Sequence, residues 1–155
     1  MKQFIPILLV VVLIAGCAKS SDPTPSTNGD YGSWSYAGDT YKATFATWTS
    51  SVLGATASKP HTSGLQAYFN SSNPPAGTYT VVSSGTAIGA NQVTIAVVDE
   101  VLPAISYISP GNNPGTVTVA RNGSAVTVTV TNVKVLGFTS KAVADSTVVT
   151  GTIKK

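Results

Sequence analysis

The sequence predicts an all-β protein: an antiparallel two-sheet β-sandwich of about 8–9 strands that follows a short leader and a flexible tether. Short runs rich in Val, Ile, Thr and aromatic residues recur from Tyr31 onward, and Gly-, Pro- and Asn-rich segments separate them. No stretch shows a helical 3.6-residue period of useful length. A sandwich is favoured over a barrel, because two packed sheets bury their apolar faces against each other without having to close.

The first expected strands contain most of the aromatic residues. Residues 33–36 predict one strand and residues 41–48 a second, with Tyr41 and Phe45 on one face and Trp48 on the other. Five further segments follow as expected strands, the first of them weak enough to be a loop: 52–57, 65–69, 78–82, 92–98 and 105–108.

The clearest hairpin joins residues 116–119 to residues 126–130 through Asn122-Gly123, a pair that tolerates positive φ. Each arm alternates valine with threonine, so each has one apolar face. The valines then move from even to odd positions, which predicts a β-bulge near Thr131-Asn132. Residues 148–153 are expected to form the last strand.

The N-terminus reads as a secretory leader, residues 1–16. Lys2 supplies a positive start, residues 4–15 an apolar core and Gly16 a small residue before Cys17. A transmembrane helix needs about 20 apolar residues to cross roughly 30 Å of hydrocarbon, so this run is too short to be a stable span.

Ile14-Ala15-Gly16-Cys17 resembles the lipobox of bacterial lipoproteins, with Ile14 where leucine is usual. The resemblance implies that a diacylglycerol is joined to the Cys17 thiol and that the leader is then cut before it. Acyl chains such as palmitate would anchor the chain to a membrane without spanning it. Lipoproteins kept at the inner membrane carry aspartate directly after the lipidated cysteine, so Ala18 favours the outer membrane. The sequence does not indicate whether the domain faces the periplasm or the outside. The alternative is an ordinary leader with an incidental cysteine.

Residues 17–30 have almost no apolar side chains and two prolines, so we expect a disordered tether between the lipid and a domain at 31–155. Only 10% of the residues are charged, against roughly 25% in typical globular domains, so the polar surface carries hydroxyl groups more than charges. Apart from the adjacent Lys154 and Lys155, the lysines and arginines are scattered singly, so no nucleic-acid partner is implied.

A search for chemistry yields no catalytic, metal or cofactor site. His61, the only histidine, lies near Ser63 in an expected loop, and loop neighbours rarely assemble a catalytic triad. One histidine without a free cysteine is a poor zinc site. Asp99 and Glu100 are adjacent at a strand end, so their side chains should point apart.

Trp34, Tyr36 and Trp48 are the candidate ligand-binding residues. Aromatic faces on a β-sandwich can stack on sugar rings, and Trp48 is the best candidate for exposure. The competing interpretation places the same residues in the core, where Trp and Tyr are most often found.

Three further motifs resemble small β-sandwich lipoproteins of unknown function that are common in Bacteroidetes. They are Gly77-Thr78-Tyr79 after a proline-rich turn, the Gly-Thr-Val-Thr-Val run at 115–119, and Thr-Gly-Thr-Ile at 150–153. The family has no established catalytic residues to carry over.

The sequence thus predicts a non-enzymatic, lipid-anchored protein of the cell envelope with a structural or binding role. Its expected partners are the membrane, through the lipid on Cys17, and a glycan or another envelope protein. The alternatives are a carbohydrate-binding module that uses surface aromatics, and a small hydrolase in which His61 faces a carboxylate in a cleft.

Overall fold

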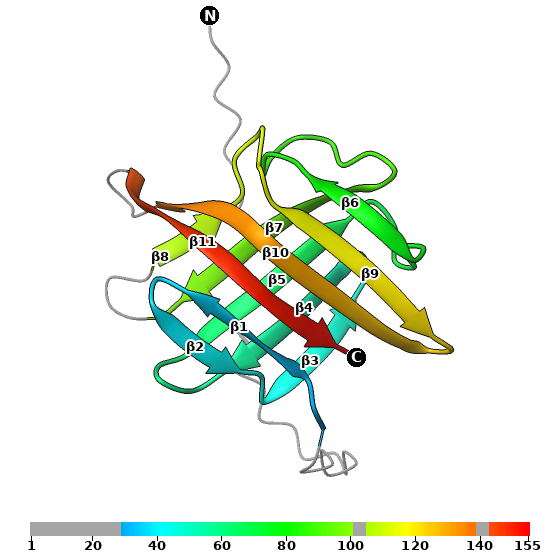
Figure 1. Cartoon of the computed structure of the whole chain (residues 1–155), viewed down its shortest axis with the longest axis horizontal. Helices are drawn as coiled ribbons and strands as arrows, with labels where there is room; N and C mark the ends of the chain where they lie inside the picture. The colour runs from blue at the N-terminus through cyan, green and yellow to red at the C-terminus, as the bar shows by residue number, and fades with distance from the viewer. Residues whose placement is uncertain (1–28, 101–104, 139–142) are drawn as a thin grey trace, which may run out of the picture.

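The computed structural model describes residues 29–100, 105–138 and 143–155, which form eleven strands and no helix (Figure 1). The all-β prediction is confirmed. The leader, Cys17 and the tether up to residue 28 lie outside the described residues. Within the described ranges there is no helix with the length and hydrophobicity needed to cross a bilayer. The strands are β1 (Gly32–Tyr36), β2 (Asp39–Lys42), β3 (Phe45–Thr49), β4 (Val52–Ala57), β5 (Ser63–Phe69), β6 (Gly77–Val81), β7 (Gln92–Asp99), β8 (Ile105–Ile108), β9 (Thr116–Asn122), β10 (Ala125–Phe138) and β11 (Val143–Lys154).

One hydrogen-bonded path connects the strands in the order β2-β1-β11-β10-β9-β6-β7-β5-β4-β3, and β8 pairs with both β10 and β7. This departs from two separate antiparallel sheets of about 8–9 strands, since β6 joins the two halves and runs parallel to β7. The weak segment 52–57 is strand β4, and the last strand starts earlier than residue 148.

The path bends into two layers (Figure 1). β2, β1, β11, β10 and β9 lie in front, and β7, β5, β4 and β3 cross behind them. The alternating inward positions of both layers make one core, as the period-2 pattern predicts. Its largest fully buried side chains include Trp34, Tyr36, Tyr41, Tyr79, Leu53, Leu65, Ile95 and Ile153.

The expected single strand at 41–48 is wrong. β2 ends at Lys42 and β3 begins at Phe45, and these two strands are the opposite ends of the path. Ala43 and Thr44 carry the chain from one layer to the other: the Ala43 N–H donates to Gly32 and the Thr44 N–H to Thr56. Because the chain changes layer here, the alternation resets, and Phe45 is exposed.

The bulge expected near Thr131-Asn132 is confirmed. The pairing of β10 with β11 shifts register between Val130 and Val133, and Asn132 has φ +51°. Both valines are therefore buried despite their opposite parity. In the β9–β10 hairpin Asn122 pairs with Ala125, so the central turn residues are Gly123 and Ser124. Only the glycine there has positive φ.

Candidate functional site

The main polar cluster of the core, here called the Asp99 cluster, comprises Tyr36, Tyr41, His61, Ser63 and Asp99. Tyr36 donates a 2.5 Å hydrogen bond to Asp99 Oδ2, and His61 Nε2 lies 3.0 Å from Asp99 Oδ1. Tyr41 Oη is 2.7 Å from the same nitrogen of His61. Strands β1, β2, β5 and β7, together with the loop that contains His61 before β5, thus bring together groups that are distant in the sequence.

The phenols of this cluster are held in their neutral form. Burial, and then the hydrogen bond to the Asp99 carboxylate, strongly raise the pKa of Tyr36. Burial also raises the pKa of Tyr41, partly offset by its hydrogen bond with Tyr36, and the pKa of Tyr107. Because these hydroxyls stay protonated at neutral pH, Tyr36 remains a donor for Asp99.

The two tyrosine rings of the cluster belong to a column of aromatic rings that also includes the neighbouring Trp34 and Tyr107. Trp34 and Tyr41 are stacked with ring centroids 5.6 Å apart, and Tyr41 and Tyr36 with centroids 5.0 Å apart. Tyr107 meets Tyr36 edge-on at 5.6 Å. Packing therefore fixes the Tyr36 and Tyr41 hydroxyls opposite Asp99 and His61.

His61 lies outside the strands, as the sequence predicts, but it is half-buried and faces a carboxylate, although a loop histidine is ordinarily exposed to solvent. The arrangement is nevertheless not that of a nucleophile and its base. Ser63 is 1% exposed, and its hydroxyl donates to Tyr36 at 3.4 Å, not to His61. Such a serine has no access to a substrate.

Asp99 is expected to stabilise the fold. Asp99→Ala would leave the buried Tyr36 hydroxyl and the His61 imidazole without their acceptor, so we expect the free energy of unfolding to fall by about 2–3 kcal/mol. Urea unfolding checks this, and Glu100→Ala, at the exposed neighbouring position, is the matched control expected to change stability by less than about 0.5 kcal/mol. Equal stability of the two variants would contradict a structural role for Asp99.

The structure buries two of the three candidate ligand-binding aromatics. Trp34 and Tyr36 are 1% and 2% exposed, so they cannot form an exposed coplanar pair for a sugar. Trp48 is half-buried: its indole stacks on the buried Phe69 with centroids 5.8 Å apart, and its Nε1 donates to the Ser50 carbonyl. A reason for this placement is that large aromatic side chains gain most by filling the space between two layers.

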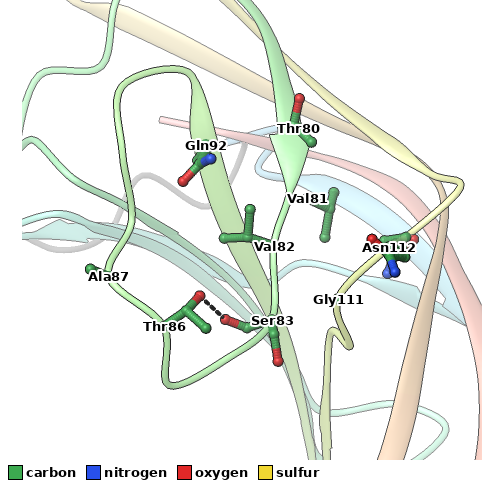
Figure 2. A pocket seen from close by; sticks show the side chains of 10 residues that line it. Thr80, Val81, Val82, Ser83, Thr86, Ala87, Gln92, Gly111 and Asn112 are labelled. Carbon is green, nitrogen blue, oxygen red and sulfur yellow. Dashed lines mark hydrogen bonds between the residues drawn. The ribbon is translucent and has the colours of Figure 1, made fainter.

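A separate surface pocket of about 440 Å³ lies between the 82–91 loop and the 109–115 turn (Figure 2). Thr86 is held there by a 2.7 Å hydrogen bond to the Ser83 carbonyl, and the Gln92 amide accepts from Gly89. None of the lining residues is charged; they are Thr80, Val81, Val82, Ser83, Thr86, Ala87, Gln92, Gly111, Asn112 and Asn113. Such a lining suits a neutral, hydroxylated ligand better than an ionic one.

Sequence reasoning missed the contacts of the Asp99 cluster. Tyr41 and Asp99 lie 20 and 38 residues from His61, and no local motif marks these pairs. In the described part of the chain, no group of three or more His, Cys, Asp or Glu residues is placed to hold a metal ion.

Comparison with known proteins finds no relative of this chain. No family model, no curated protein and no solved structure matches the chain.

Proposed function

We propose that the chain is a lipid-anchored protein of the bacterial envelope, at the outer membrane, whose β domain has a non-enzymatic structural or binding role. The observation that carries the proposal is Ile14-Ala15-Gly16-Cys17 at the end of an apolar leader. The cysteine is the only one in the chain, so its thiol has no disulfide partner within the chain.

The described domain supports a non-enzymatic role. Its one close histidine–carboxylate pair, His61 and Asp99, is engaged with core tyrosines, and Ser63 is buried. These residues link β1, β2, β5 and β7, and their hydrogen bonds satisfy one another. They therefore serve the fold.

The lipid anchor is tested in cells with a labelled fatty acid. The full chain should incorporate the label and sediment with outer-membrane fragments, while Cys17→Ser should lose both the label and the membrane association. Ser20→Ala, three residues further on, is the control that should behave as the wild type. A labelled Cys17→Ser variant, or an unlabelled wild type, would refute the proposal.

A glycan-binding role is the second candidate, and the uncharged pocket of Figure 2 favours it over the buried aromatics. If neutral oligosaccharides bind there, Asn112→Gly should weaken them about five-fold, the value of one hydrogen bond of about 1 kcal/mol. Asn91→Gly is the matched control, because Asn91 is also exposed with positive φ but does not line the pocket. Equal affinities in calorimetric titration would exclude the pocket.

A further inference from the structure

The end of the domain at which the chain enters β1 has its own surface chemistry. This tether-side surface consists of Tyr31, Lys42, Phe45, Lys154 and Lys155. The Lys154 N–H donates to the Tyr31 carbonyl, and the Ala43 N–H, next to Lys42, donates to Gly32. In Figure 1 the start of β1, the end of β2, the start of β3 and the end of β11 lie on the lower side of the domain.

Two neighbouring aromatic rings belong to this surface, one of them exposed and the other half-buried. Phe45 is 48% exposed, which is unusual for a phenylalanine, and Tyr31 is half-buried beside it. Their ring centroids are 6.4 Å apart with planes tilted by 54°. An apolar ring beside a ring with a polar tip is the pairing found at the interface between lipid and water.

The lysines give the same surface a positive charge. Lys42 and Lys155 are exposed, and Lys154 forms an ion pair with Asp30, which precedes β1. The hydrogen bond from Lys154 is the main cause that lowers the pKa of Asp30, and the charge of Lys42 contributes. Among the side chains of this surface, three lysines therefore outnumber one carboxylate.

The other acidic residues of the described chain lie toward the opposite end of β1. Asp39 pairs with Tyr36, and Asp99 accepts from the Tyr36 hydroxyl. Glu100 follows Asp99, and Asp145 lies near Thr147, whose hydroxyl accepts from the Ala37 N–H. The described carboxylates other than Asp30 therefore lie away from the tether-side surface, at an end of the domain where Lys59, two residues before His61, is the neighbouring lysine.

We propose that the tether-side surface docks the domain on an anionic lipid bilayer, with Phe45 and Tyr31 at headgroup depth and the lysines against phosphates. The inference rests on the lipid anchor of the proposed function. A lipid on Cys17 would be only 12 residues from Gly29, which keeps this end of the domain within about 40 Å of the membrane. The bilayer is thus the partner that this surface meets most often.

The docking is testable on the lipidated full chain in vesicles. A solvatochromic dye on Thr47→Cys reports contact, because Thr47 is exposed on the same side of β3 as Phe45 and leaves Phe45 in place. The same dye on Val148→Cys, an exposed position of β11 at some distance from Lys154, is the matched control. The vesicles are phosphatidylglycerol with phosphatidylcholine, or phosphatidylcholine alone.

We expect the dye at 47 to shift to the blue on phosphatidylglycerol vesicles, to recover in high salt, and not to shift at 148. Lys42→Gln with Lys155→Gln should lower the docked-to-undocked ratio about 30-fold, at about five-fold for each lysine. Phe45→Ser should also reduce the shift.

Equal emission at 47 in both vesicle types would overturn the docking, even if the chain floats with the vesicles. Flotation with phosphatidylcholine vesicles tests the anchor separately: if the wild type and Cys17→Ser float equally poorly, the anchor fails. The dye at 47 still reports docking in that case on a chain that also carries Cys17→Ser, which has no second thiol to label and can be added to vesicles directly.

Discussion

Trp34→Ala is expected to lower the free energy of unfolding by about 3–5 kcal/mol, the cost of emptying a large aromatic site in a core. The indole is 1% exposed and stacks on Tyr41, which in turn stacks on Tyr36. Removing it therefore leaves a void at the base of the aromatic column. For a domain whose total stability is typically 5–15 kcal/mol, this is a large fraction.

Urea unfolding of two further variants distinguishes a core role of Trp34 from a ligand-binding role. Trp34→Phe should cost less than about 2 kcal/mol, because it keeps most of the ring volume and removes an indole N–H that has no partner among the described residues. Trp48→Ala should cost only about 1–2 kcal/mol, since Trp48 is half-buried. A Trp34→Ala variant with wild-type stability would contradict the core assignment.

The features that sequence could predict are those with a local cause. Period-2 alternation made the all-β class readable, and the change of parity between Val130 and Val133 located the bulge, because one extra residue turns every later side chain over. The β9–β10 hairpin was predictable because valine alternates with threonine on both of its strands and a turn sequence lies between them. Only its turn was placed one residue early, since Gly123 alone carries the positive φ.

The features that sequence could not predict depend on strand order. Residues 41–45 alternate between apolar and polar side chains, and the adjacent apolar residues Phe45 and Ala46 are the one irregularity before residue 48. β2 and β3 nevertheless lie at opposite ends of the path, and no turn residue marks the crossing at Ala43 and Thr44. The parallel contact of β6 with β7 is likewise a long-range choice. Local pattern does not encode which strands become neighbours.

The candidate site shows the same division. Trp34 and Trp48 are chemically equal in the sequence. Their burial differs because Trp34 is in β1, between β2 and β11, whereas Trp48 is near the end of β3, the last strand of the path. The contact of His61 with Asp99 forms because β5 pairs with β7, and no sequence motif predicts that pairing. The lipobox needs no fold at all, so Cys17 remains a prediction of the sequence alone.

Gly151→Ala is expected to destabilise the domain by about 3 kcal/mol, at the upper end for overpacking. Gly151 of β11 lies opposite Trp34 of β1. A Cβ there would lie 2.5 Å from both the Ser33 carbonyl oxygen and the Trp34 Cα, and closer still to the Trp34 Cβ. These are backbone atoms and the first side-chain atom, so no rotamer change relieves the overlap and the two strands must separate.

Gly54→Ala in β4 is the matched control. Its Cβ would meet only the Gln66 Cγ, at an ordinary 3.7 Å, so the lower entropy of the unfolded alanine chain should leave it neutral or stabilising by about 0.5–1 kcal/mol. In urea unfolding, Gly151→Ala should thus lower the free energy of unfolding, while Gly54→Ala should leave it unchanged or raise it slightly.

The double variant Trp34→Ala/Gly151→Ala makes the test specific. Alanine keeps the Cα and Cβ atoms that a side chain at 151 would strike, so shortening the indole should not rescue Gly151→Ala. We expect the double variant to be at least as unstable as either single one. Recovery of stability would mean that the indole ring, and not the approach of the β1 and β11 backbones, is what requires glycine at this position.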